Sequence, residues 1–310
     1  MKSLQFKFGV ALLLLFLQVS PSGAATPTKV VKVLNPPILV HADFFQGAGG
    51  EWFKTLVSQH SIYLIGTSEP SNGPTQGEVI AIDPATGVQQ WDVVLAGSSD
   101  SIASAATLDP SGNIWISGSS APQTTIATPV ASPSPTQSNV LNPGGITVDP
   151  VPAPRQGLTQ LSVWQVSASG TLLNTFTYNA GAVIEPTEID YSKGLFQIGG
   201  RDFHITLSPT GNFTKFIQAS FVPTKVLTTQ TFKDGLYIWR SFISKGLING
   251  LKGWNPKVPT PIVIKVGSRT GKIYAAYKVT SPLLQVSFLS GVGLVLTTQS
   301  DNGYALSLLK

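Results

Sequence analysis

The strongest constraint on the fold is an internal repeat of two short landmarks. The first is a short apolar run, which occurs at residues 62–66, 114–118, 195–199, 236–239 and 294–296. The second is a turn that ends in glycine, which occurs at residues 83–87, 167–170, 208–211 and 268–271. Glycine suits this position because a tight turn between antiparallel strands needs a residue with positive φ. The landmarks predict about five copies of a unit made of short strands.

The spacing of the landmarks separates a constant segment from a variable one. From each turn glycine to the next apolar run (87 to 114, 170 to 195, 211 to 236 and 271 to 294) there are 27, 25, 25 and 23 residues. From an apolar run to its own turn glycine (62 to 87, 114 to 170, 195 to 211 and 236 to 271) there are 25, 56, 16 and 35 residues. Insertions confined to one connection per unit are typical of stacked or radially arranged modules. We therefore expect an all-β protein, a β-propeller of about five four-stranded blades.

The two ends of the chain are expected to complete one blade together. Only 16 residues separate Leu294 from Lys310, which is enough for a third strand but not for a fourth. Counting back about 25 residues from Ile62, as the repeat spacing suggests, places the missing strand near residues 38–45. We expect this segment to pair with residues 304–309 and close the ring, so that no sheet edge stays open. The alternative donor is residues 30–34.

Two segments resemble the repeats of known propellers. GEVIAIDPATGVQQW (77–91) is similar to the blade signature of pyrroloquinoline-quinone-type and outer-membrane-assembly propellers. ATLDPSGNIWISG (106–118) is similar to the repeat of bacterial exported propellers of the NHL and seven-bladed-repeat kind. The resemblance implies a bacterial exported β-propeller repeat protein. It implies no particular activity, because such folds host enzymes, receptors and scaffolds.

The N-terminus has the features of a secretory signal peptide. Lys2 and Lys7 precede an apolar run at residues 10–17, and small residues follow at 21–25. The run is shorter than the roughly 20 apolar residues that span a bilayer, so we expect residues 1–25 to be removed; an uncleaved anchor is the alternative. Residues 26–310 would then form a single propeller domain without a membrane span, either secreted or extracytoplasmic in the cell envelope or periplasm.

The composition narrows the possible chemistry. The chain has no cysteine, which excludes disulfides, thiol catalysis and Cys-ligated zinc. Without Lys2 and Lys7, 18 basic residues face 15 acidic ones, a net charge of +3 that is too mild to indicate nucleic acid as a partner. His41, His60 and His204 are not at metal-ligand spacing, and no phosphate-binding loop or nucleophile elbow occurs. We expect no metal site and no cofactor.

Both long insertions fall in the variable connection, on one face of the propeller. Residues 119–157 are rich in Pro, Ser and Thr, which predicts an extended flap, either a lid or a passive loop. Residues 240–261 contain no acid but carry the basic side chains Arg240, Lys245, Lys252 and Lys257. Together with an exposed Trp254, they would suit an anionic polymer, a glycan or a lipid headgroup. We favour the alternative, in which Trp254 packs against the neighbouring ring.

Aligning the copies places Glu185, Lys225 and Ser104 near the start of innermost strands, at the channel mouth on the same face. Glu185 and Lys225 fall in neighbouring units, so they either pair with each other or contact a ligand. The turns that begin at Asp83 and Asp109 are explained by an aspartate that accepts hydrogen bonds from its own backbone, rather than by calcium.

These observations predict an exported, non-catalytic binding or interaction module that uses its loop-rich face. Its partner would be an extracellular or cell-envelope molecule, a glycan or a protein. The enzyme alternative is a five-bladed glycoside hydrolase acting on an extracellular polysaccharide. Residues 35–43 and 62–68 resemble the opening of such enzymes, which implies Asp43 as the base and leaves Glu185 as the acid. Against this, the expected pairing places Asp43 on an outer strand, far from the channel.

Overall fold

The structure is a computed structural model that describes residues 30–42, 51–69, 73–95, 99–122, 157–214, 216–218, 229–301 and 303–310. This part of the chain is all-β and folds into five sheets. No helix in it is long and apolar enough to span a membrane.

Three of the sheets each contain four antiparallel strands in sequence order. Sheet I contains β3 (Glu51–Val57), β4 (Ile62–Ser68), β5 (Gln76–Ile82) and β6 (Gln89–Val94). Sheet II contains β7 (Ser101–Leu108), β8 (Ile114–Ser120), β9 (Gln160–Val166) and β10 (Leu172–Asn179). Sheet III contains β11 (Pro186–Ser192), β12 (Leu195–Gly200), β13 (Phe203–Leu207) and β14 (Ile217–Gln218).

The other two sheets incorporate strands from the N-terminal region. Sheet IV contains β15 (Thr229–Asp234), β16 (Tyr237–Ser244), β18 (Thr260–Gly267) and β19 (Ile273–Lys278), extended by β1 (Val31–Leu34) and β17 (Leu251–Lys252). Sheet V contains β20 (Leu283–Leu289), β21 (Gly293–Ser300), β22 (Gly303–Leu309) and β2 (Val40–Ala42).

The repeat predicted from the sequence is confirmed at the level of strands. Each apolar landmark lies in the second strand of its sheet: β4, β8, β12, β16 and β21. The turn glycines Gly87, Gly170, Gly211 and Gly271 lie between the third and fourth strands of sheets I to IV, all with positive φ. The constant segment is therefore the fourth strand of one sheet followed by the first two strands of the next. The variable connection joins the second strand to the third.

The expected pairing of the chain ends is also confirmed for the residues described. β2 pairs antiparallel with β22, with Val40 opposite Leu306 and His41 opposite Ala305. The alternative donor, residues 30–34, belongs to sheet IV instead, where β1 runs parallel to both β19 and β17. The N-terminal region thus contributes one strand to each of two sheets.

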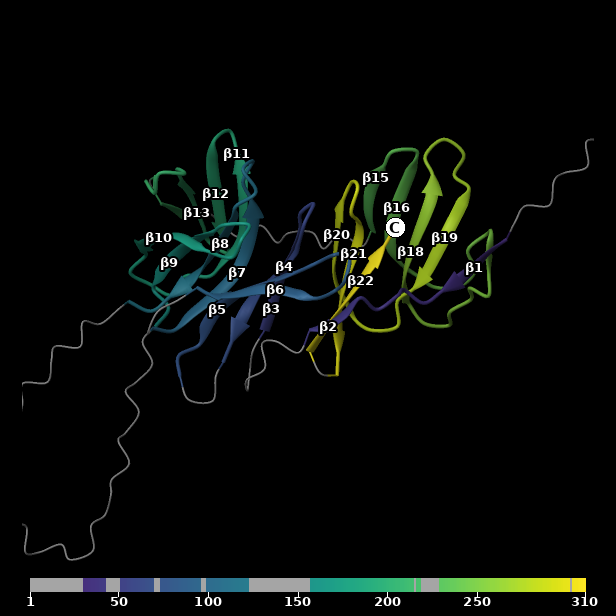
Figure 1. Ribbon diagram of the computed structural model, residues 1–310, viewed down its shortest axis with the longest axis horizontal. Helices are drawn as coiled ribbons and strands as arrows, with labels where there is room; N and C mark the ends of the chain where they lie inside the picture. The colour runs from purple at the N-terminus through teal and green to yellow at the C-terminus, as the bar shows by residue number, and fades with distance from the viewer. Residues whose placement is uncertain are drawn as a thin grey trace, which may run out of the picture.

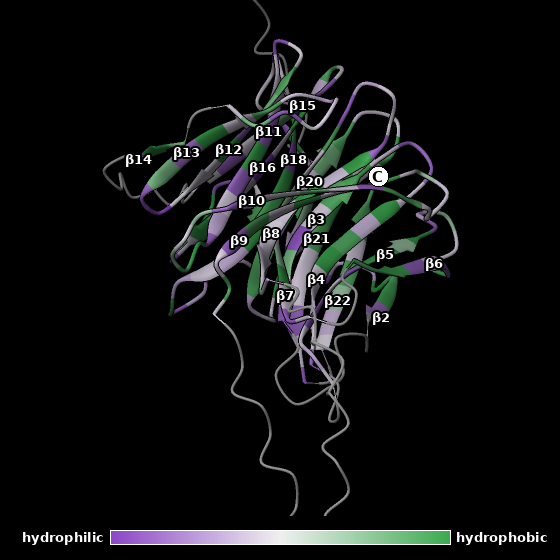
Figure 2. Cartoon of the chain, turned by 90° about the vertical axis from the view of Figure 1, so that its left-hand side faces the viewer, coloured by the Kyte–Doolittle hydropathy of each residue, from purple (hydrophilic) through white to green (hydrophobic). Residues whose placement is uncertain are grey.

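Four apolar clusters join the sheets in the order III, II, I, V, IV. In Figure 1, sheets II and III lie together at the left, sheet I follows, and sheets V and IV lie to the right. Figure 2, which looks along this row, shows apolar residues distributed along the strands. Between sheets II and III, for example, the Trp115 ring stacks on Phe196 with ring centroids 3.9 Å apart. Because side chains alternate between the two faces of a strand, one strand supplies the cores on both of its sides.

The two sheets at the ends of the row do not close into a ring. Among the described residues, no apolar cluster joins sheet III to sheet IV, and the two sheets lie at opposite ends of the molecule (Figure 1). The apolar face of sheet IV that includes Ile262 and Ile264 is covered by β1 and by Leu251 and Trp254. Because its own chain already buries this face, sheet IV has little apolar surface left there for a neighbouring sheet. The closed ring expected from the sequence is therefore not what the structure describes.

Candidate functional site

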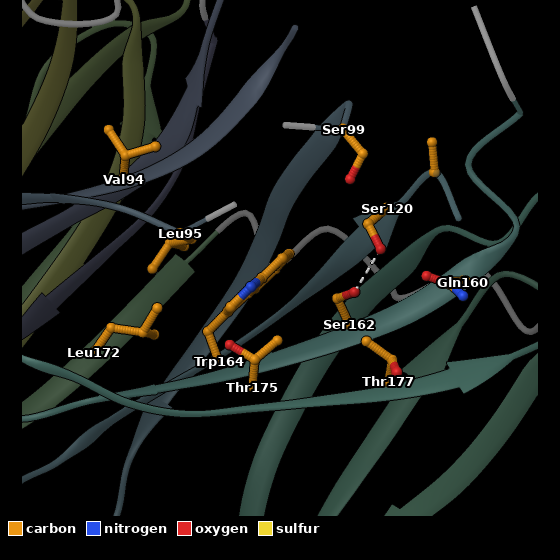
Figure 3. Close-up of a pocket in the computed structure, with 11 residues that line it drawn as sticks. Val94, Leu95, Ser99, Ser120, Gln160, Ser162, Trp164, Leu172, Thr175 and Thr177 are labelled. Atoms are coloured by element: carbon orange, nitrogen blue, oxygen red, sulfur yellow. Dashed lines mark hydrogen bonds between the residues drawn. The ribbon is translucent and has the colours of Figure 1, made fainter. Parts of the chain in front are cut away.

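A cavity of about 590 Å³ lies between sheets I and II (Figure 3). It is lined by Val94, Leu95, Ser99, Ser120, Ala121, Gln160, Ser162, Trp164, Leu172, Thr175 and Thr177. Leu95 and Ser99 belong to the connection from sheet I to sheet II, while Ala121 and Gln160 lie at the two ends of the long connection from β8 to β9. The cavity therefore opens where the sequence predicts the loop-rich face.

The cavity exists because one face of sheet II changes from apolar to polar side chains along its strands. On β8 this face runs from Ile114 and Ile116 to Gly118 and Ser120, and on β9 it runs from Val166 and Trp164 to Ser162 and Gln160. The apolar half packs against sheet I in a shared core. The polar half has small side chains that do not fill the space between the sheets, so a cavity remains there.

Gly118 determines where the Trp164 ring lies. A Cβ atom at residue 118 would be 2.8 Å from Cζ3 of Trp164 and only 1.9 Å from the carbonyl oxygen of Ile102. The absence of a side chain lets the indole lie against β8, where it forms part of the cavity wall (Figure 3). The Trp164 side chain is 2% exposed, so most of the ring is core and only a small part of it meets the cavity.

The polar groups of the wall are mostly uncommitted. Ser120 Oγ and Ser162 Oγ lie 2.7 Å apart and form one hydrogen bond, which uses one of their two hydroxyl hydrogens. Within the described ranges, the side chains of Gln160, Thr175 and Thr177 have no hydrogen-bond partner. Thr175 and Thr177 are alternate residues on β10, so both hydroxyl groups lie on the same face of the strand. The wall thus presents a row of groups that both donate and accept hydrogen bonds.

Charged groups with shifted pKa values lie outside the cavity. Burial raises the pKa of Glu78, with an additional contribution from the negative charge of Asp92, while a hydrogen bond with Ser68 lowers it. Glu78 alternates with Ile80 on β5, and Ile80 belongs to the core between sheets I and V. Burial also lowers the pKa of Lys54 on β3. None of the described residues that line the cavity is charged.

The structure brings together few of the residues predicted at the channel mouth. Glu185 is exposed and immediately precedes β11, the first strand of sheet III. Ser104 on β7 donates hydrogen bonds through Oγ to the carbonyl oxygens of Ser117 and Pro186, so it links sheets II and III. Lys225, the predicted partner of Glu185, lies outside the described residues. So does Asp43, the predicted base of a hydrolase; β2, which precedes it, is the outermost strand of sheet V.

The two predicted insertions differ in how much of them is described. Most of 119–157 lies outside the described residues. The segment 240–261 begins within β16 and ends within β18. The connection between these strands therefore spans 245–259, and it contains β17. Arg240, Lys245, Lys252 and Lys257 are exposed.

Trp254 is a core residue of sheet IV, as the favoured interpretation of the sequence predicts. Its side chain is 2% exposed, and its Nε1 donates a hydrogen bond to Ser244 Oγ at 3.3 Å. It packs in one cluster with Leu251 and Ile262. The idea of an exposed tryptophan on a basic loop is therefore wrong.

The aspartates at the turns bind their own backbone, as predicted. Asp83 accepts from the amides of Ala85 and Thr86, and Asp109 accepts from those of Ser111 and Asn113. In the described ranges, no three His, Asp or Glu side chains come together as a metal-ligand set.

The sequence matches no known protein family and no curated protein. The solved structures with similarity to this chain include the following three, each 11% identical to it. A protein of unknown function from Bacteroides caccae aligns over 82% of this chain and 73% of its own, with a TM-score of 0.35. The CNH domain of AfRom2 aligns over 84% and 65% (TM-score 0.31), and a quinohemoprotein alcohol dehydrogenase from Comamonas testosteroni over 84% and 52% (TM-score 0.37). This chain spans about half the length of the dehydrogenase. Nothing about ligand or activity follows from similarities this low.

Proposed function

We propose that this chain is an exported, non-catalytic binding module that takes its ligand at the loop-rich end of a row of five propeller-like sheets, in the cavity between sheets I and II. The observation that carries the proposal is the position of the cavity. It lies where the connection between two sheets and the longest insertion of the repeat meet, and loops gathered at one end of a rigid scaffold commonly carry binding sites.

The chemistry of the wall supports binding rather than conversion. The described residues that line the cavity include no carboxylate, imidazole or amine, the groups that most often act as general acids and bases. The wall combines apolar surface with a few polar groups, and its volume lies within the usual range for small-molecule sites. The role does not depend on contact between sheets III and IV, because the described residues that line the cavity belong to sheets I and II and to the connections of their strands.

The signal peptide predicted for residues 1–25 supports a role outside the cytoplasm. The ligand would then be met in the cell envelope or outside the cell. A secretion assay with the full chain, in which residues 26–310 should be recovered without the leader, checks this part of the proposal.

Filling the cavity should abolish binding. Thr177 is exposed on the edge strand β10, so Thr177→Trp is expected to place an indole in the cavity without disturbing the core. The matched control is Thr231→Trp, because Thr231 is also exposed on an edge strand but lies in sheet IV, away from the cavity. Residues 26–310 of each protein would be applied to an array of glycans, peptides and cell-envelope polymers.

We expect the unsubstituted protein and Thr231→Trp to bind the same ligand with the same affinity. Thr177→Trp should bind this ligand at least tenfold more weakly. Equal binding by both variants, or no binding by the unsubstituted protein, would contradict the proposal.

A further inference from the structure

We infer that the cavity between sheets I and II is built for an uncharged, polyhydroxylated ligand, that is, a short neutral oligosaccharide. This inference rests on the proposed binding function and goes further by naming the chemical class of the ligand.

The described part of the wall carries no charge, which disfavours ionic ligands. None of the described lining residues is Asp, Glu, His, Lys or Arg. A carboxylate, phosphate or ammonium group entering the cavity would give up part of its hydration shell and gain no opposite charge in return. A neutral ligand avoids this cost.

The hydrogen-bonding groups of the wall match the hydroxyl groups of a sugar. Five of the lining residues carry hydroxyl groups, and Gln160 adds an amide with two donors and one acceptor. A hydroxyl group both donates and accepts, so its best complement is a ligand whose own groups do the same. Thr175 and Thr177 present two such groups on the same face of β10, about 7 Å apart, with no partner among the described residues. A sugar chain carries hydroxyl groups all around its rings, so it can reach both of them.

The apolar groups of the wall complete the match. Val94 and Leu172 are 44% and 39% exposed, although they are large apolar side chains next to a polar wall. Figure 3 shows Val94, Leu95 and Leu172 on one side and the serine and threonine hydroxyls on the other. A sugar ring has C–H faces and a hydroxyl rim, so it can use both kinds of surface at once.

A peptide strand would be recognised differently. Peptides that add to a sheet bind the free backbone groups at a strand edge. The cavity is instead walled by side chains on one face of sheet II, namely Gln160, Ser162, Thr175 and Thr177. The recognition groups are therefore side-chain hydroxyls and an amide. They suit a ligand that binds side chains rather than one that pairs with the sheet as an extra strand.

The experiment uses calorimetric titration of residues 26–310 with two kinds of probe. The neutral probes are tetrasaccharides built from glucose, xylose or N-acetylglucosamine, and the acidic probe is an oligogalacturonate of the same length. The variant is Thr175→Val/Thr177→Val, which removes both hydroxyl groups and keeps the side-chain shape. Its matched control is Thr229→Val/Thr231→Val, another pair of exposed, alternating threonines on the edge strand β15. Valine is favoured in strands, so both variants should fold, which circular dichroism checks.

We expect at least one neutral tetrasaccharide to bind, the acidic probe to bind at least tenfold more weakly, and Thr175→Val/Thr177→Val to raise the Kd about tenfold, because two hydrogen bonds are lost. The control should leave the Kd unchanged. Equal weakening in both variants, or no binding of any neutral probe, would overturn the inference. Binding of only the acidic probe or of a peptide, sensitive to Thr177→Trp, would also overturn the ligand class but leave the proposed function standing.

Discussion

Replacing Gly118 with alanine is expected to lower the free energy of unfolding by about 3 kcal/mol, the upper end of the usual cost of overpacking a core. The new Cβ would lie 1.9 Å from the carbonyl oxygen of Ile102, a backbone atom that cannot rotate away. It would also lie 2.8 Å from the Trp164 ring, which is held in the core between sheets I and II. Either β7 separates from β8 or the indole moves into the cavity. Urea unfolding measures the cost.

Gly157→Ala is the matched control. Among the described residues, a Cβ there meets only Thr159 and Val183, at 3.6 Å and 3.8 Å, and Gly157 is not one of the described glycines with positive φ. We expect its stability to stay within about 1 kcal/mol of the unsubstituted protein, since a tolerated Gly→Ala change mainly reduces the entropy of the unfolded chain. If Gly118→Ala were as stable as Gly157→Ala, the close packing of β7, β8 and Trp164 would be wrong.

Replacing Trp115 with alanine should cost about 3–5 kcal/mol, as is typical for a large buried aromatic side chain. Trp115 is 1% exposed and packs between Phe176 and Phe196 in the core that joins sheets II and III. Its Nε1 also donates a hydrogen bond to Asp109 Oδ2 at 3.0 Å. The substitution therefore removes packing and a partly buried hydrogen bond together. Thermal and urea unfolding should both shift.

Trp115→Phe separates the two contributions, because it keeps most of the packing and loses the N–H group. Burial acts to raise the pKa of Asp109, but hydrogen bonds from Trp115, Asn113 and Ser111 outweigh it and hold the pKa below its usual range. This stabilisation is present above the pKa of the unfolded carboxyl group and is lost as the pH falls through the lower folded-state pKa. We expect Trp115→Phe to be about 1 kcal/mol less stable near pH 7 and to converge with the unsubstituted protein in acid. A difference that stayed constant with pH would contradict this role of Asp109.

Much of the fold could be predicted from the sequence because the repeat is encoded locally. A glycine is needed at each turn with positive φ, as at Gly87 and Gly211. The number of residues from this glycine to the next apolar run indicates how long the intervening strands are. The pairing of residues 38–45 with the C-terminal strand followed from counting strands. The separation of sheets III and IV could not be predicted in the same way. It depends on β1, whose short apolar segment is equally compatible with sheet V or with the face of sheet IV that it covers.

The candidate site was not predicted, since its signal lies in strand faces rather than in motifs. The basic residues and Trp254 indicated a binding loop at 240–261, whereas most of the polar residues that line the cavity are serines and threonines, which belong to no recognisable motif. The usable signal was the change along alternate residues of β9, from Val166 and Trp164 to Ser162 and Gln160, together with a matching change on β8. A buried face that turns small and polar towards one end predicts a gap between sheets, but only once the neighbouring sheet is known.

The central claim is that the chain forms consecutive four-stranded modules, the last of which is completed by residues 40–42. Because the chain has no cysteine, engineered disulfides test this directly. His41→Cys/Ala305→Cys places two thiols at directly opposite positions of β2 and β22, close enough to bond on mild oxidation. Lys32→Cys/Ala305→Cys tests the alternative donor, residues 30–34. The account predicts an intramolecular disulfide in the first variant and free thiols in the second, scored by mass spectrometry after thiol labelling; the reverse result would contradict it.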